Sequence, residues 1–428
     1  MALTEKSPYQ IFAQPSLPLS WEAAFRDNLA NWPIKLHPQL EKAWEMAWSL
    51  GLPDRKDESW RWMDYKRLDF ESLRLNSQTS PIRLTVSFFS EAADEQPTPI
   101  SLPEGVVITT LREFFEHHQD LAVRLLTEND LITEGTFAAL PSALANDGLI
   151  VYIPQDVKLD GMVQCLLEIP LDNRAVFTLN LVCLEEGASL NLELVWVSPD
   201  SYLSGFHNGI LDVRLGQQSS LNLDETQQFA RVDWNISHER ASLAADSQLE
   251  WNYAAIGSDT SKNFIKVELQ GEGSSAVLNG AMFPTGEQVI NLDTRQNHWA
   301  ESTFSNLMYK SVVSQRGRSV WHGMIYVDPE AQKTDAFQTN KNLVLDDLAD
   351  VKSVPGLEIH ANDVKCSHGA TVGKIDPGEF YYLQTRGIPQ KEAEKLIVEG
   401  FFNQIVQSFR LEKTQRELLD QLMSRMNS

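Results

Sequence analysis

The apolar residues in the first part of the chain are spaced mostly as in amphipathic helices. One helix is predicted to begin at Trp21, with Ser20 as its N-cap. A second is predicted to run from about Pro38 to Leu50, because Gly51 after its last turn is a typical C-terminal cap. The pattern therefore predicts a helical start to the chain.

A capping-box pattern predicts another helix further along. Thr110 and Glu113 have the spacing of the N-cap and N3 residues of that motif, and the helix should extend to about His118. Residues 80–104 are rich in proline and acidic residues and indicate strand and loop. We therefore expect residues 1–147 to form a mainly helical N-terminal domain with a short strand and loop segment.

The pattern changes in the middle of the chain, where short runs of alternating apolar residues replace the helical spacing. In a loose repeating unit, a corner rich in glycine, alanine or aspartate precedes serine and an alternating strand. The strand positions Leu190, Leu221, Leu249 and Val277 are separated by 31, 28 and 28 residues. Strands at such a period, without helices between them, predict a β-solenoid over residues 148–376, and a stacked sandwich is the alternative.

Helical spacing returns at the C-terminal end of the chain. Pro389 suits the first turn of a helix, and apolar residues then recur in steps of four. These residues are Ala393, Ile397, Phe401, Ile405 and Phe409. A second amphipathic stretch runs from Leu411 to Met426. We expect residues 377–428 to form a C-terminal helical domain that either packs on its own chain or docks a partner.

The composition indicates a globular protein with a strong acidic charge. Lysine and arginine number 36 and aspartate and glutamate 59, a net charge of −23, which disfavours nucleic acid and anionic membrane surfaces as partners. No stretch approaches the roughly 18 uninterrupted apolar residues of a membrane span, and the first residues lack the pattern of a signal peptide. We therefore expect a cytoplasmic protein that binds neither nucleic acid nor membranes.

The chain has three cysteines, which is too small a number, and an odd one, for a disulfide framework. In alternating strands Cys165 shares its side with Leu167 and Cys183 shares its side with Leu181, so we expect both to be core residues. The motifs of phosphate-binding loops, dinucleotide-binding folds, serine esterases and zinc proteases do not occur. Three cysteines cannot supply the four thiolates of an iron–sulfur centre, so another molecule would have to complete one.

The third cysteine lies in a polar segment with two histidines. If residues 357–369 formed one unbroken strand, His360, Cys366 and His368 would lie on the same face, opposite Leu357. A neighbouring imidazolium would favour the thiolate of Cys366. Cys366 and His368 together supply two metal ligands, whereas a closed site generally needs four. Cys366 and His368 are therefore either part of a site that another molecule completes or a surface pair without a function.

Four stretches of the sequence resemble motifs of one protein family. Residues 362–373 read Asn-Asp-Val-Lys-Cys-Ser-His-Gly-Ala-Thr-Val-Gly, and residues 380–388 read Phe-Tyr-Tyr-Leu-Gln-Thr-Arg-Gly-Ile. Both resemble the C-terminal signature of D-type subunits of the SufB/SufD family, the scaffold proteins of SUF iron–sulfur cluster assembly. Residues 331–343 resemble the family's shared core motif, and residues 51–60 resemble its aromatic helix-edge motif. B-type subunits are usually longer and typically carry His-Glu-Ala at the Cys-Ser-His segment.

The resemblance implies a mainly β fold, with a right-handed parallel β-helix core between N-terminal and C-terminal helical domains. The implied function is that of a scaffold subunit, not an enzyme, which assists de novo iron–sulfur cluster assembly. The implied partners are a SufB-type β-helix subunit and a SufC-type ATPase held by the C-terminal helical domain, with a homodimer for the isolated chain. A transient iron–sulfur cluster shared with the partner is the implied cofactor, together with reduced flavin at the level of the complex.

The resemblance also assigns roles to single residues. His368 matches a histidine that helps to build the nascent cluster at the interface of the two β-helix subunits, opposite a cysteine of the SufB-type subunit. Cys366 is the neighbouring thiol, so both residues are expected metal ligands, and His360 is a further interface residue. Asn362 stands where the family commonly has a second aspartate, which removes one negative charge near the site.

Two other functions remain open from the sequence. One is a polysaccharide-active β-helix enzyme, which would need paired carboxylates or an acidic calcium groove on one face of the solenoid. The other is a purely structural subunit, in which Cys366 and His368 are interface residues without metal chemistry.

Overall fold

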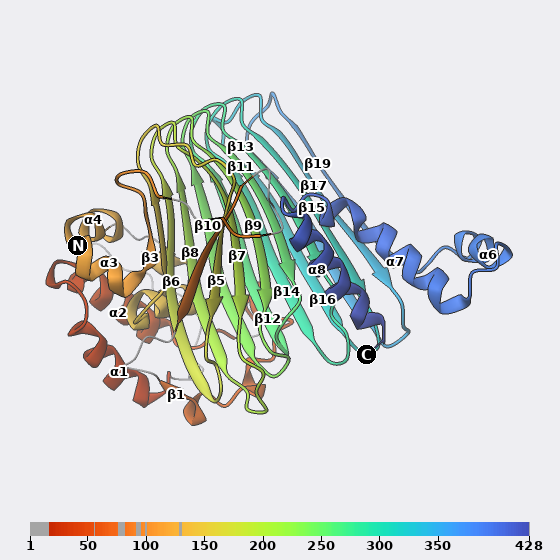
Figure 1. Cartoon of the computed structure of the whole chain (residues 1–428), viewed down its shortest axis with the longest axis horizontal. Coiled ribbons are helices and arrows are strands. Elements are labelled where there is room, and N and C mark those ends of the chain that lie inside the picture. The colour runs from red at the N-terminus through yellow and green to blue at the C-terminus, as the bar shows by residue number, and fades with distance from the viewer. Residues whose placement is uncertain are drawn as a thin grey trace, which may run out of the picture.

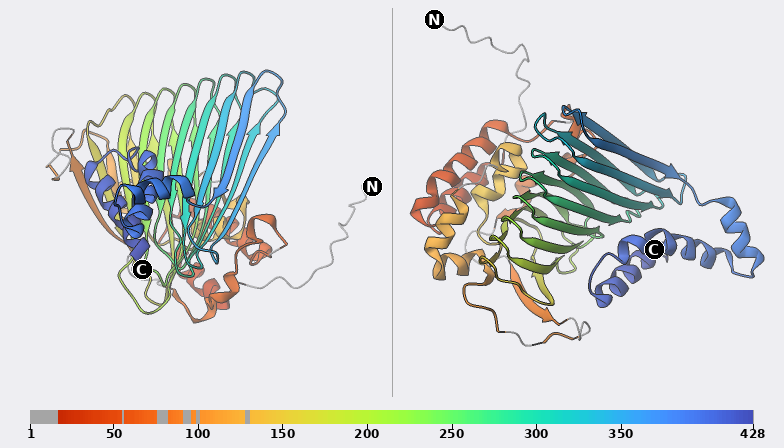
Figure 2. Two further views of the ribbon diagram at one scale, coloured as in Figure 1. Left: turned by 90° about the vertical axis from the view of Figure 1, so that its right-hand side faces the viewer. Right: turned by 90° about the horizontal axis from the view of Figure 1, so that it is seen from above.

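The computed structural model describes residues 17–54, 56–75, 82–90, 96–98, 101–127 and 131–427. Two large sheets face each other across a common interior, and the chain passes between them in successive coils (Figures 1 and 2). Helices lie at both ends of the described chain. The fold is therefore mainly β, a β-helix with flanking helices, as the sequence predicted.

The first sheet has ten strands in the described part of the chain. Its order is β18-β16-β14-β12-β10-β8-β6-β4-β3, with β1 paired to β6. The strands are β1 (Arg74–Leu75), β3 (Val107–Thr110), β4 (Leu149–Ile153), β6 (Arg174–Leu184), β8 (Phe206–Leu215), β10 (Trp234–Leu243), β12 (Thr260–Leu269), β14 (Val289–His298), β16 (Arg318–Val327) and β18 (Asp350–Ile359). From β4 to β18 the pairing is parallel, which is the pattern expected of a solenoid.

The second sheet has nine strands among the described residues. Its order is β19-β17-β15-β13-β11-β9-β7-β5-β2. The strands are β2 (Arg83–Phe89), β5 (Met162–Glu168), β7 (Ser189–Val197), β9 (Ser220–Gln228), β11 (Gln248–Ala255), β13 (Ser275–Met282), β15 (Phe304–Val313), β17 (Asp335–Val344) and β19 (Lys365–Gly373). Strands β18 and β19 are thus the last strands of the two sheets.

The N-terminal helices cover the outer face of the first sheet near its β3 end (Figure 2). They are α1 (Leu19–Leu29), α2 (His37–Leu50), α3 (Leu111–His117), α4 (Gln119–Leu126) and α5 (Thr136–Leu144), with the short 3-10 helices η1 (Ile34–Leu36), η2 (Glu58–Trp60), η3 (Tyr65–Arg67), η4 (Phe70–Ser72) and η5 (Leu131–Glu134). Trp21 and Phe137 of the helices pack with Phe177 and Phe206 of the sheet. These aromatic contacts join the helical layer to the solenoid.

The predicted helix ends are mostly confirmed. Helix α2 begins one residue before the predicted start and ends at Leu50 as predicted, with Gly51 as its C-cap at a φ of 63°, which needs glycine's freedom. The Thr110 hydroxyl accepts a hydrogen bond from the backbone N–H of Glu113, as the capping box predicts. The prediction of Ser20 as an N-cap is wrong, because α1 begins at Leu19 and its N-cap is Pro18.

The predicted period is confirmed for three of the four strand positions. Leu190 pairs with Leu221, and Leu221 with Leu249, all facing the solenoid interior. The fourth position is wrong by one residue, because Leu249 lies opposite Ala276 rather than Val277. Ala276 is fully buried, so the interior here takes the smaller side chain and the larger valine faces outwards.

One corner of the coil explains the recurring motif. Gly187, Gln218, Asp246 and Gly273 have φ values of 67°, 55°, 55° and 71°, and the backbone N–H of each donates to a carbonyl one coil further on. The next residue is small and buried in each case. These residues are Ala188, Ser219, Ser247 and Ser274. A residue that tolerates the left-handed conformation, followed by a small one, is thus what each coil requires.

Cys165 and Cys183 are core residues, as predicted. Cys165 is fully buried in the solenoid interior, and Cys183 is buried on the outer face of β6 beneath the N-terminal helices. Burial raises the pKa of each thiol to about 12, so neither is a thiolate at neutral pH.

Replacing Cys165 or Cys183 by alanine is expected to lower the free energy of unfolding by about 1 kcal/mol or more, because each change leaves a small cavity. The measurement is urea unfolding of each variant, with Cys366→Ala as the partly exposed control. In the native protein, a thiol reagent should modify Cys366 before either core cysteine. Rapid modification of Cys165 in the folded state would contradict its assignment to the core.

Three helices follow the solenoid, α6 (Pro377–Thr385), α7 (Gln390–Val406) and α8 (Glu412–Ser424), and a short 3-10 helix η6 (Arg425–Asn427) ends the described chain. Helices α7 and α8 lie on the outer face of the second sheet, and α6 projects away from it (Figures 1 and 2). Phe402 packs on Phe283 of the sheet side. The guanidinium of Arg425 is buried and donates to the carbonyl oxygens of Phe283 and Ile256. Helices α7 and α8 are therefore part of the solenoid's packing.

The predicted apolar stripe of α7 is only partly right. Ile405 is buried, but Ile397 and Phe401 are only partly buried, and their neighbours Val398 and Phe402 are buried instead. Steps of four residues rotate a stripe by about 40° per step around an α-helix, so a straight contact line needs steps of three as well.

Candidate functional site

The end of the solenoid at β18 and β19 exposes part of its apolar interior. Leu357 and Ile359 on β18 stand in register with buried Ile325 and Val327 on β16, yet they are 37% and 38% exposed. On β19, Val372 is 55% exposed although its register partner on β17 is buried. Within the described chain no further coil covers this end, which we call the open end.

The segment with Cys366 and His368 is not one unbroken strand, so that expectation is wrong. Strand β18 ends at Ile359, residues 360–364 cross between the sheets, and β19 begins at Lys365. The crossing explains why the alternation of strand β18 does not continue through Asn362 and Asp363. It also places Leu357 and Cys366 in different sheets.

Cys366 lies on the side of β19 that faces the interior of the open end. It stands opposite buried Ala336 and packs against the small buried cluster that contains Ala336, Ile325 and Val327. Burial and the carboxylate of Asp335 raise the pKa of the thiol, while a hydrogen bond with the backbone of Ala336 opposes the rise. The isolated chain therefore does not activate this cysteine as a thiolate, contrary to the suggestion from the sequence.

His368 has the same orientation as Cys366, two residues further along β19. Its register partner is Gln338, which is fully buried in the preceding coil. His368 itself is exposed, because β19 is the outermost strand of its sheet. The alternation of β19 thus presents a thiol and an imidazole side by side at the open end.

His360 points to a different side. Its Nε2 atom lies 3.1 Å from the Glu358 carboxylate, and its ring centroid lies 5.6 Å from that of Tyr326 on the outer face of β16. The structure therefore brings Cys366 and His368 onto one face and places His360 on the border of the open end.

No group of three or more His, Cys, Asp or Glu residues suited to a metal ion occurs among the residues that the structure describes. Cys366 and His368 are two ligands of suitable chemistry for iron, since thiolate and imidazole both bind it. A metal centre built on this pair needs ligands from another molecule.

Two family models match the chain. The SufBD core domain of SUF system FeS cluster assembly matches residues 169–401, and the N-terminal region of SufBD proteins matches residues 78–165. The chain belongs to the SufBD family. The core match covers the solenoid from β6 to β19 and most of α7, so it includes the open end with Cys366 and His368.

Two relatives carry the name of one SufBD subunit. The iron–sulfur cluster assembly protein SufD of Bacillus subtilis is 25% identical over 397 residues, which is 89% of this chain and 90% of that protein. SufD of Escherichia coli is 34% identical over 192 residues, 45% of each chain. An iron–sulfur cluster assembly SufBD family protein of Staphylococcus epidermidis is 25% identical over 279 residues, 65% of this chain and 60% of that protein.

The sequence did not reveal that the interior of the solenoid is open at Leu357 and Ile359. The sequence did contain a signal for this exposure. Leu357 and Ile359 alternate with polar residues along the last strand of the repeat, and no later repeat unit follows to cover their side chains. As to membranes, no helix in the described parts of the chain is long and apolar enough to span one.

Proposed function

We propose that this SufBD chain is a scaffold subunit of SUF iron–sulfur cluster assembly and not itself an enzyme, acting in the cytoplasm. The observation that carries the proposal is the open end, where Cys366 and His368 stand together on an uncovered strand. Two ligands are too few to hold an iron–sulfur cluster, so the missing ligands would come from a second subunit that completes the site. The names of the SufD relatives support this role.

The proposed partner at the open end is a SufB-type β-helix subunit. Among the described residues β19 is the last strand of its sheet, so its outer edge offers backbone donors and acceptors for pairing, and Leu357, Ile359 and Val372 add apolar contacts. An uncovered strand edge with apolar side chains is a typical site for pairing with another chain. A second copy of the same chain would occupy this end when the SufB-type subunit is absent.

The nascent cluster is the cargo of this interface. His368 would bind iron through an imidazole nitrogen, and the Cys366 thiol would lie beside it, deprotonated only once the partner or iron is present. His360 would contact the partner at the border. Reduced flavin is proposed only for the assembled complex, and we assign no residue to it. Replacement of His368 in the assembled complex tests the function, because the change removes a ligand at the exposed surface.

We further propose three domains, 1–147, 148–376 and 377–428, with the last docking a SufC-type ATPase. Helix α6 supports this role, because it buries none of its residues and presents Tyr381 and Tyr382 to solvent. Exposed aromatic residues on a projecting helix are typical anchors of a protein interface.

The double change Tyr381→Ala and Tyr382→Ala is expected to weaken binding of the ATPase subunit at least tenfold, since buried interface aromatics often contribute more than about 1 kcal/mol each. Co-purification and calorimetric titration of the two subunits measure the effect. The matched control is Tyr202→Ala, since Tyr202 is a fully exposed tyrosine in the loop before β8. Native affinity in the double variant would rule out α6 as the docking element. Deleting the whole C-terminal segment is a poorer test, because α7 and α8 cover the second sheet.

A further inference from the structure

An open cavity of about 420 Å³ lies on the outer face of the first sheet. Its walls come from strands β12, β14, β16 and β18 and from Glu58, Ser59 and Glu134 of the N-terminal region. The volume suits a small organic molecule. The cavity uses neither Cys366 nor His368, so an inference about it does not depend on the proposed function.

Three basic residues form a row across the strands beside this cavity. Arg240, Lys266 and Arg295 stand in register on β10, β12 and β14. Neighbouring strands lie about 4.8 Å apart, so the three positive charges would repel one another without nearby carboxylates.

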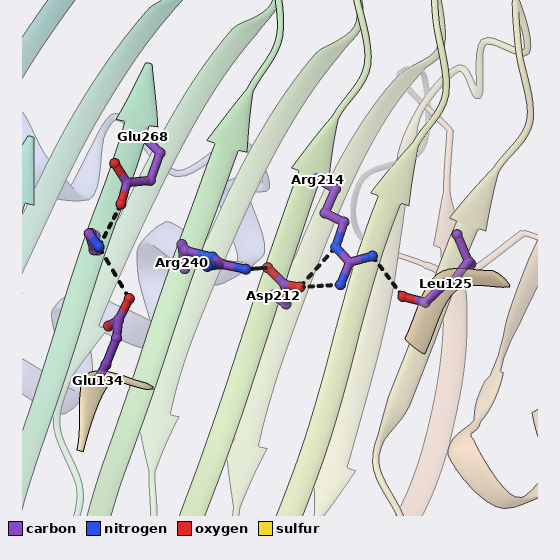
Figure 3. Close-up of polar contacts among 7 residues, drawn as sticks. Leu125, Glu134, Asp212, Arg214, Arg240 and Glu268 are labelled. Carbon is purple, nitrogen blue, oxygen red and sulfur yellow. Dashed lines mark hydrogen bonds and ion pairs between the residues drawn. The ribbon is translucent and has the colours of Figure 1, made fainter. Parts of the chain in front are cut away.

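The first two members of the row each have carboxylate partners. Arg240 lies 3.4 Å from the carboxylate of Asp212, which also binds Arg214 at 2.7 Å (Figure 3). Lys266 lies 3.2 Å from Glu134 and 2.5 Å from Glu268. In Figure 3 Asp212 lies between Arg240 and Arg214, and Glu268 of the sheet and Glu134 of the N-terminal region approach one amino group from two sides, which is the pair of Lys266 contacts just given.

Arg295 is the exception in the row. It is exposed on the cavity wall, and within the described residues it makes no ion pair and no side-chain hydrogen bond. The carboxylate nearest along its own strand, Asp293, is already paired with the fully buried ammonium of Lys262. The wall therefore keeps one cation that is available to a ligand.

The rest of the wall is suited to an uncharged molecular body. His322 lines the cavity, and burial lowers the pKa of its imidazole, so it is a neutral hydrogen-bonding group at neutral pH. Phe264, Met324 and Val354 add apolar surface. The remaining acidic group, Glu58, is exposed and has no ion-pair partner among the described residues.

We propose that this cavity binds a small organic anion, with a carboxylate or phosphate group on Arg295 and an apolar body against Phe264 and Met324. The planar guanidinium can hold either group through two parallel hydrogen bonds. His322 provides a second polar contact that orients the ligand. Glu58 opposes anion binding by charge repulsion, so its removal should strengthen the interaction.

The test is calorimetric titration of the full-length chain with three probes: benzoate, phenyl phosphate and benzylammonium. We expect one or both anions to bind and the cation not to bind, and the comparison of the two anions separates a carboxylate site from a phosphate site. Arg295→Gln should weaken anion binding at least tenfold, and Glu58→Gln should strengthen it by about twofold or more. Arg316→Gln is the matched control, because Arg316 is an exposed arginine outside the cavity.

A second variant fills the cavity and keeps the positive charge of Arg295. Val354→Trp should fill the cavity and abolish binding, and thermal unfolding checks that each variant remains folded. Failure of both anions to bind the native chain would overturn the proposal. Unchanged affinity in both Arg295→Gln and Val354→Trp would overturn it as well, because binding would then occur elsewhere.

Discussion

Replacing His368 by alanine is expected to reduce the iron–sulfur cluster content of the assembled complex at least tenfold. The imidazole lies on the outermost strand at the open end, where it faces a partner rather than its own core. Loss of one ligand from a site with few ligands removes a large part of the metal affinity. Because the side chain is exposed, its removal leaves little cavity and should barely change stability.

The measurement is iron and sulfide content, with the visible absorption spectrum, of complexes purified without oxygen from cells that express all proposed partners. Ser367→Ala is the matched control, because Ser367 is exposed and points to the other side of β19. Cys366→Ala should have a milder effect, since the partner can supply sulfur ligands. A full cluster content in the His368→Ala complex would favour a purely structural subunit.

The solenoid could be predicted from the sequence because its local requirements recur. Each coil needs a left-handed corner residue, a small buried residue and an alternating strand, and these leave a visible period from Leu190 to Leu249. The burial of Cys165 followed from the same alternation. Local pattern and global fold agree at these positions, which is why the prediction succeeds.

The candidate site could be predicted only in part. The Cys-Ser-His motif identified Cys366 and His368, whose spacing of two residues places them on one face of any strand. The position of His360 could not be predicted, because it depends on where the chain leaves β18 for the other sheet. The position of such a crossing is determined by how whole coils stack on one another. The sequence of one polar segment does not indicate where it lies.

Polar residues inside the solenoid were also missed. Glu225 lies on the same side of β9 as Leu221 and Leu223, so the alternation points it into the interior although its charge suggests the surface. Glu239 on β10 points inwards in the same way, with buried Ala241 and Leu243. The sequence did contain a signal, because each glutamate is separated from a leucine of its strand by an even number of residues. The acidic residue type argued against an interior position and hid this signal.

The two interior glutamates form a buried acidic cluster. Glu225 accepts hydrogen bonds from the indole N–H groups of Trp196 and Trp251 at 2.7 and 3.0 Å. Glu239 accepts one from the Ser237 hydroxyl at 2.5 Å. Both line a void of about 20 Å³, room for about one water molecule.

Burial is the main cause of the altered acidity in this cluster. It raises the pKa of Glu239 to about 7, and burial together with the charge of Glu239 raises the pKa of Glu225 well above its ordinary value. The neighbouring phenols of Tyr253 and Tyr309 also have raised pKa values and stay neutral. At neutral pH the folded chain therefore holds at least one of the two carboxyl groups protonated.

A chain with Glu239→Gln is expected to lose the part of the pH dependence of stability that this carboxyl group contributes between about pH 4.5 and 7. Unfolded Glu239 ionises near 4.5 and folded Glu239 near 7, so the native free energy of unfolding should fall as pH rises through this window, by about 3 kcal/mol for this group, and level off above it. Glutamine keeps the oxygen that accepts from Ser237 and cannot ionise, so the variant should be the more stable protein at pH 8. Urea unfolding of both proteins from pH 5 to 8 measures the difference, in which the other buried acids cancel except Glu225, whose pKa falls when the neighbouring charge is removed. Glu287→Gln is the matched surface control, since Glu287 is an exposed glutamate paired with Arg316. Parallel stability curves for the native chain and Glu239→Gln would show that the interior does not hold this carboxyl group protonated.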